Sequence, residues 1–175
     1  MADEDNGRLG WYESSAHTLM PLGSGLHIPK SLRRVLNQSR FSLRTSADVA
    51  GVVAGCRDRP STWISDELAE TYLALAEHGI VKTYEAWQGD VLAGGVLGLH
   101  LGKAYIGESM FTAIEDGGKV ALVRLCQHLE ARGFALFDAQ LTNPHLTRFG
   151  SYEVPLAQYL PMLSKALEGQ AVFEV

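Results

Sequence analysis

Cysteines, long apolar runs and metal-ligand spacings are scarce in this 175-residue sequence. Its two cysteines, Cys56 and Cys126, are too few for a disulfide framework or a zinc knuckle, so we expect buried thiols in a cytosolic protein. The six histidines share no metal-binding spacing, and no metal site is predicted. No segment approaches the roughly 20 apolar residues of a membrane span, and the acidic start does not resemble a signal peptide. These absences predict a cytoplasmic protein without a membrane partner.

The composition is that of a globular protein, but its charge is unevenly distributed. Hydrophobic residues make up 46% of the chain and charged residues 20%, which suits one domain with a sizeable core. The net charge is −5, yet residues 30–59 contain seven basic and only two acidic side chains. Such a basic segment on an acidic protein can hold a phosphate backbone, and a solvated basic surface is the equally weighted alternative.

The first third of the chain predicts little regular structure. We expect residues 1–10 to be a disordered lead-in and residues 11–29 to be mostly loop. Ser31 is placed to cap a short helix that ends near Asn37, and residues 41–44 alternate like a strand. Thr45 or Ser46 is then expected to cap a helix that runs to about Cys56.

Stronger patterns follow from residue 65 onward. Ser65, with two acids behind it, predicts the start of a helix that Gly79 ends. Two segments separated by residues 88–90 predict a hairpin whose glycines invite a bulge or a close backbone approach. The other expected elements are a strand over 103–107, a helix over 119–132, a buried strand over 134–137, a helix over 156–167 and an edge strand over 171–175. This succession predicts an α+β fold.

Two carboxylates stand out because each ends an apolar run. Glu108 is followed closely by Met110 and Phe111, and a carboxylate beside apolar surface is costly unless it is paired or used. Asp138 and Gln140 have the spacing that places two strand side chains on one side, where they can position an amine and accept its proton. The alternatives are a salt bridge for Glu108 and a turn capped by Asp138.

Weaker signals surround these carboxylates. Residues 117–119 look like half of a phosphate-binding loop, although simple helix initiation explains them better. His145 lies near Asn143 in a loop and is a candidate for substrate binding, with a structural polar contact as the favoured alternative. Trp63 sits in a loop where a base can stack on it, but tryptophans more often belong to the core.

Several motifs together resemble the bacterial leucyl/phenylalanyl-tRNA–protein transferases. The motifs occur in that family's order and spacing, from about Trp11 to Leu160, and the most specific are GESMF at 107–111 and the downstream Asp138-Ala139-Gln140. The others are residues 26–32, Thr62-Trp63-Ile64, residues 91–95, Lys119 with Ala121-Leu122, and residues 142–146.

The resemblance implies a fold and a reaction. The fold is expected to be of the GCN5-related acyltransferase type, with a mixed, mostly antiparallel sheet flanked by helices. The reaction moves Leu, Phe or Met from charged tRNA to the N-terminal amine of a protein, which marks that protein for degradation. Residues 11–59 are then a remnant of an N-terminal basic region and 60–175 the catalytic domain. The chain is expected to be a short form without the family's usual N-terminal portion.

The resemblance also implies residue roles. Asp138 and Gln140 match the pair that handles the attacking amine, and Glu108 matches the acidic residue of the acceptor site. The apolar pocket for the transferred side chain corresponds to Met110, Leu122 and Phe137, with Phe111 beside it, while Trp63 matches a tryptophan near the aminoacyl-adenosine. The basic segment becomes the expected tRNA surface, through Lys30, Arg33, Arg34, Arg40 and Arg44.

The remaining expectations concern partners and rivals. An aminoacyl ester is already activated, so no cofactor is required, and a monomer is expected. Acceptors with basic N-termini are usual in the family, while related enzymes accept acidic ones. Two alternatives stay open: an acyl-CoA N-acetyltransferase, and a non-catalytic module that binds peptide N-termini.

Overall fold

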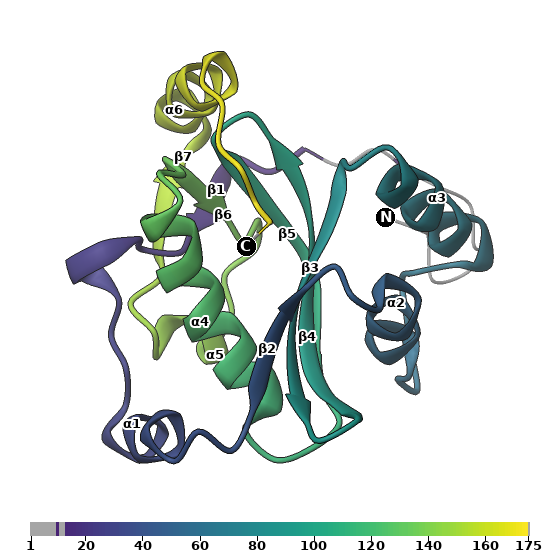
Figure 1. The fold of residues 1–175 in the computed structure, drawn as a ribbon. Helices are drawn as coiled ribbons and strands as arrows, with labels where there is room; N and C mark the ends of the chain where they lie inside the picture. Colours follow the sequence, from purple (N-terminus) through teal and green to yellow (C-terminus); the bar gives the residue numbers. More distant parts are fainter. Residues whose placement is uncertain (1–9, 11–12, 175) are drawn as a thin grey trace.

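A seven-stranded sheet forms the centre of the structure, a computed structural model that describes residue 10 and residues 13–174 (Figure 1). The strand order is β2-β3-β4-β5-β6-β1-β7, and every neighbouring pair is antiparallel except β5 and β6. The strands are β1 (Ala16–Leu19), β2 (Ser42–Thr45), β3 (Val81–Gln88), β4 (Val91–Leu101), β5 (Ala104–Thr112), β6 (Leu136–Asp138) and β7 (Tyr152–Pro155). The predicted mixed, mostly antiparallel sheet is confirmed.

Helices cover both faces of this sheet, as expected for an α+β fold. Helix α4 (Gly117–Ala131) packs on β3, β4 and β5, with α1 (Lys30–Asn37) and α5 (Pro144–Thr147) on the same side (Figure 1). Helices α2 (Val49–Arg57) and α3 (Asp66–Glu77) cover the opposite face, and α6 (Leu156–Glu168) packs beside β1 and β7. Within the described residues, no helix is long and apolar enough to span a membrane.

Strands from the first third of the chain are part of this sheet. Strand β1 lies between β6 and β7, and β2 pairs with β3 at one edge. Residues on both sides of the expected boundary near residue 60 therefore build one sheet. The lead-in expected over residues 1–10 falls almost entirely outside the described residues.

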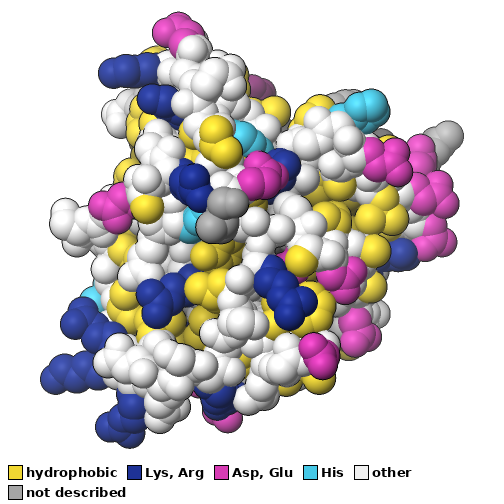
Figure 2. Space-filling model, viewed as in Figure 1, with side chains coloured by type: hydrophobic (Ala, Val, Ile, Leu, Met, Phe, Trp, Pro, Cys, Tyr) yellow, Lys and Arg dark blue, Asp and Glu magenta, His cyan; other side chains and the backbone are white. Residues whose placement is uncertain are grey.

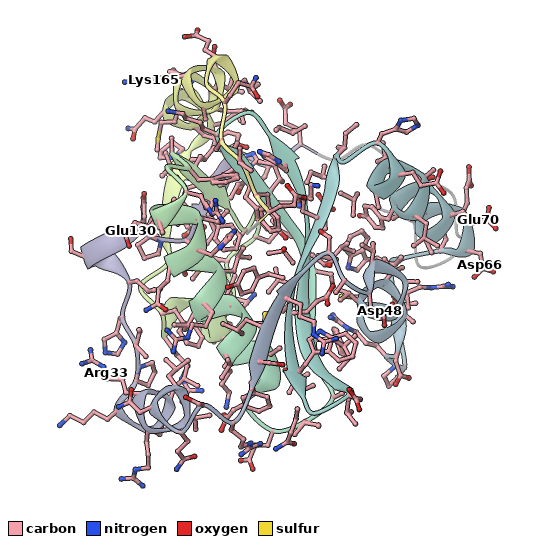
Figure 3. The ribbon with its side chains drawn as sticks, viewed as in Figure 1. Arg33, Asp48, Asp66, Glu70, Glu130 and Lys165 are labelled. Carbon is pink, nitrogen blue, oxygen red and sulfur yellow. The ribbon has the colours of Figure 1, made fainter. Side chains whose placement is uncertain are left out.

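Most predicted helices and strands are present, but two predicted caps are wrong. Ser65 caps α3 as predicted, since its hydroxyl accepts the Leu68 N–H at 3.2 Å. Helix α2 is instead capped by Asp48, whose carboxylate accepts the Gly51 N–H at 2.8 Å (Figure 3). Ser46 cannot serve because it adopts a left-handed conformation, with φ of 48°. Helix α1 begins at Lys30, one residue before the predicted cap Ser31. Its N-cap position is Pro29, and it has no side-chain cap.

Two predicted bounds after residue 60 also differ from the structure. Strand β5 runs to Thr112 instead of residue 107, because its outer half stays paired with β4. No strand forms over residues 171–174, although Phe173 is fully buried in the core next to α4. Strand β7 and helix α5 were not predicted, and β1 lies within residues 11–29, where loop with short extended pieces is expected.

Glycines bring α4 unusually close to β4. A Cβ atom on Gly94 would lie 2.4 Å from the backbone nitrogen of Gly118, and one on Gly117 would lie 2.3 Å from the carbonyl oxygen of Ala93. The predicted close backbone approach is thus confirmed. Because α4 begins at Gly117, the glycine pair is explained by helix initiation and by packing against the strand.

Candidate active site

A pocket of about 210 Å³ opens where β5 and β6 stop being neighbours. The parallel pairing of these strands ends at Ile106 and Asp138, while β5 continues alone on this side to Thr112. The divergence leaves a gap between a strand and the turn that follows β6. Six of the predicted site residues line the pocket: Trp63, Glu108, Met110, Leu122, Phe137 and Asn143.

One wall of the pocket is apolar. Leu122 on α4 and Phe137 on β6 are both 2% exposed, and the flexible side chain of Met110 packs against the same core cluster. Val96 on β4 and Leu146 on α5 complete this wall. A lining of this kind accepts an unbranched or γ-branched apolar side chain, since methionine adapts its shape to the occupant.

Glu108 is aimed into the pocket by a β-bulge. Gly107 pairs with Gly98 and Ser109 pairs with Leu97, so Glu108 is an extra residue without a partner on β4. Such bulges redirect side chains next to functional sites. The local signal in the sequence was only the glycine at position 98, opposite the bulge.

The carboxylate of Glu108 is held by two neutral donors. The Tyr72 hydroxyl on α3 donates to it at 2.9 Å, and the side-chain amide of Gln140 donates at 3.0 Å. Burial raises the pKa of Glu108 above its ordinary value, while these two hydrogen bonds act in the opposite direction. The alternative of a salt bridge to Arg or Lys is not observed among the residues that the structure describes.

Asp138 lies behind the pocket and is 1% exposed. One of its oxygens accepts the backbone N–H of Gln140 at 2.7 Å. The other accepts the Tyr159 hydroxyl at 2.7 Å and contacts Nδ1 of His17 at 2.8 Å. The rings of His17 and Tyr159 stack with centroids 3.7 Å apart. The capped turn is therefore observed, and Asp138 has a donor on each oxygen.

The expectation that Asp138 and Gln140 share a strand face is wrong. Strand β6 ends at Asp138, and Gln140 adopts a left-handed conformation with φ of 63°. The turn nevertheless brings the Gln140 amide to Glu108 and to the carbonyl of Gly107, at 3.0 Å each. Asp138 thus orients Gln140, and Gln140 in turn contacts Glu108.

A second hollow, of about 390 Å³, adjoins the pocket along β5. Phe111 and His145 line this hollow instead of the pocket. Because strand side chains alternate, Phe111 points away from Met110 and packs over Gly55 on α2. Arg59 lines both spaces and donates to Ser109 Oγ at 3.2 Å and to the Met110 carbonyl at 2.5 Å.

Comparison with known proteins identifies the family of the chain. The family model for leucyl/phenylalanyl-tRNA protein transferase matches residues 19–164. The chain belongs to this family. It is 54% identical to the leucyl/phenylalanyl-tRNA–protein transferase of Gloeothece citriformis, over 97% of this chain and 88% of that one. It is 50% identical to the protein of that name from Synechocystis sp., over 99% of this chain and 87% of the relative.

In this family member, the predicted tRNA residues do not form one patch. Lys30, Arg33 and Arg34 lie on α1, where Figure 2 shows basic side chains gathered at the lower left. Arg40 donates to the Glu115 carbonyl and lies over Phe41. Arg44 stacks on Trp87 at 4.5 Å, on the face of the sheet that α2 covers.

The sequence did not identify four residues that the transferase fold adds to the site. Tyr72 is a buried residue of α3, and Arg59 belongs to the basic segment over residues 30–59. His17 and Tyr159 reach Asp138 from positions 121 and 21 residues away in the chain. No local sequence pattern predicts such contacts, because they form only when β1 and α6 pack beside β6.

Proposed function

We propose that the protein transfers a leucyl or phenylalanyl group from tRNA to the N-terminal amine of an acceptor protein, with Glu108 as the proton acceptor. The observation that carries this assignment is the half-buried Glu108 carboxylate, which faces an apolar pocket and is held by neutral donors. The apolar wall suits the transferred side chain, and the carboxylate suits the amine that attacks it.

The reaction needs little beyond positioning and proton transfer. The amine nitrogen attacks the ester carbonyl, the bond to the ribose oxygen breaks, and the proton passes from nitrogen through Glu108 to that oxygen. An α-amine titrates near about 7.7–8.0, so part of it is neutral at cellular pH. Burial that raises the pKa of Glu108 makes this carboxylate a stronger base than an exposed one.

Asp138 and Gln140 act through Glu108 in this proposal. Asp138 fixes the left-handed turn at Gln140, and the Gln140 amide fixes one carboxylate oxygen of Glu108. Tyr72 fixes the other oxygen. These bonds hold the carboxylate in one orientation. A base fixed in position beside the amine can lower the activation barrier by several kcal/mol.

The finer assignments follow from the same site. Divergence of the parallel β5–β6 pair beside a bulge supports a fold of the GCN5-related type. A negative carboxylate at the acceptor position favours acceptors that begin with a basic residue. We further propose a cytoplasmic monomer. The packing of Gly117 and Gly118 against β4 accounts for that pair without a phosphate, so nothing favours the acyl-CoA alternative.

Transfer from charged tRNA to a panel of peptides tests the proposal. We expect Phe-tRNA and Leu-tRNA to label a peptide that begins with Arg, and Asp138→Ala to lose most of this activity while it still unfolds cooperatively. Acetyl-CoA should neither acetylate the peptide nor raise the melting temperature. Peptide binding without any turnover would support the non-catalytic module instead.

A further inference from the structure

Three hollows follow one another across the molecule. The pocket shares Arg59 and Met110 with the hollow along β5, and that hollow shares His145 with a third space of about 240 Å³. The third space lies between α1, α4 and α5. The row thus begins at the apolar wall and Glu108 and ends at the helix on which basic side chains gather (Figure 2).

The third space, here called the basic basin, is lined by cations from three helices. Arg34 comes from α1, Lys119 from α4, and Arg148 directly follows α5. Asp116 is the one carboxylate in the lining and pairs with Lys119 at 2.7 Å. Three cations facing one carboxylate leave an excess of positive charge, which suits a polyanion better than a single neutral ligand.

His145 stands between the basic basin and the hollow along β5. Its Nε2 atom is buried and has no hydrogen-bond partner in the described part of the chain. The ring packs edge-on against Phe149, so the expected structural polar contact of Nε2 is not observed. Lys119 and Arg148 line the basic basin together with His145, and burial and these two cations lower the pKa of His145.

Arg59 lies between the pocket and the hollow along β5, as His145 lies between that hollow and the basic basin. Both of its hydrogen bonds, to Ser109 and to Met110, use the same terminal nitrogen. Arg59 lines both spaces, and Asp58 also lines the hollow along β5, while the guanidinium has further N–H donors beyond the nitrogen used in these bonds. A guanidinium so placed can contact a phosphate that passes between them.

We propose that the single-stranded acceptor end of the aminoacyl-tRNA follows this row, with its aminoacyl group in the pocket, Arg59 beside the terminal nucleotides, and a backbone phosphate in the basic basin. This path rests on the proposed function. It adds Lys119, Arg148 and His145 to the tRNA contacts expected from α1. Helix α1 is held beside α4 by apolar side chains such as Leu32 and Val35, and this packing leaves Arg34 facing the basin.

The test compares donors of different length. The double variant Arg34→Ala/Arg148→Ala removes two exposed basin cations, and Lys165→Ala/Arg132→Ala is the charge-matched control. Lys165 lies on α6, at the opposite end of the molecule from Arg33 on α1 (Figure 3). The donors are Phe-tRNA, a CCA trinucleotide charged with Phe, and 3′-phenylalanyl-adenosine, which has no phosphate.

The basin variant should lose roughly tenfold or more in kcat/KM per lost phosphate contact with the two longer donors. With 3′-phenylalanyl-adenosine it should match the wild type. The salt dependence of trinucleotide binding should weaken by about 0.7 in logarithmic slope for each lost contact. The control variant should behave as the wild type with every donor.

Three results would overturn the path: equal losses with all donors, no loss with any donor, or a loss with tRNA but not with the trinucleotide. Failure of the proposed function is a separate outcome, in which the wild type transfers from none of the donors. Binding of a labelled, uncharged CCA trinucleotide, followed by fluorescence anisotropy, then still tests the basin, because it requires no turnover.

Discussion

The two walls of the pocket are built in opposite ways. The apolar wall of Met110, Leu122 and Phe137 is part of a packed core, where many weak van der Waals contacts together supply the stabilisation. The polar wall is a chain of single hydrogen bonds from Asp138 through Gln140 to Glu108, with Tyr72 at its far end. A substitution in the apolar wall should therefore reduce function by a small amount. Loss of a single hydrogen-bonding atom in the polar wall should reduce it strongly.

Glu108→Gln should break the polar wall with the largest effect on activity. The amide keeps the size of the side chain but cannot accept a proton, so kcat/KM with Phe-tRNA should fall about 10²- to 10⁴-fold. Steady-state kinetics checks the fall, and the melting temperature should change little. Activity equal to the wild type would remove Glu108 from the role of proton acceptor.

The same variant makes a prediction about pH and stability. The pKa of Glu108 is raised by burial above its ordinary value of 4.5, so its ionisation opposes folding. Protonated Glu108 therefore contributes to the unfolding free energy. This contribution is fully present below pH 4.5 and is lost as the pH rises through the higher pKa of the folded state. Glu108→Gln should flatten this part of the dependence of the unfolding free energy on pH, measured by urea titration.

Asp138→Ala should damage the same wall from behind, with a loss of stability in addition to the loss of transfer. It leaves the Tyr159 hydroxyl and the Gln140 N–H without their buried acceptor, at a cost of about 1–3 kcal/mol each. Chemical denaturation measures the loss. The matched variant Tyr159→Phe removes one of these donors and keeps the turn, so it should lose less stability and retain transfer.

Met110→Ala should show the gentler response of the apolar wall. The shortened side chain leaves a wider pocket, which should reduce discrimination between Phe and smaller apolar groups by roughly 1–3 kcal/mol. Competition between charged tRNAs measures the ratio of kcat/KM values. Met110→Leu conserves volume and serves as the control, with an expected change below about 1.5 kcal/mol.

Tyr72→Phe should have the smallest effect and sharpen the comparison. It removes one hydrogen bond to the Glu108 carboxylate and leaves both the aromatic ring and the Gln140 bond to that carboxylate in place. Since that bond lowers the pKa of Glu108, its loss should raise this pKa and move the acid limb of the kcat/KM profile to higher pH. An unchanged limb would mean that another group controls it.

Much of the fold could be predicted because its signals are local. The Ser65 cap, the hairpin and the glycine-bounded helix near residues 117–133 rest on short-range patterns, and the structure confirms them. The two wrong caps show the limit of such signals. Several hydroxyls preceded α2, and backbone conformation selected Asp48.

The sequence by itself determined the family, the α+β class and six of the residues that line the pocket. Those conclusions depend on residue types and spacings, which are properties of the chain alone. Only the tertiary structure decided how the residues act together. The bulge that aims Glu108, the turn at Gln140, and the approach of Tyr72, His17 and Tyr159 all arise from packing between distant segments. Met110 and Phe111 point to opposite faces of β5 because strand side chains alternate, but tertiary packing decides which clusters they join there.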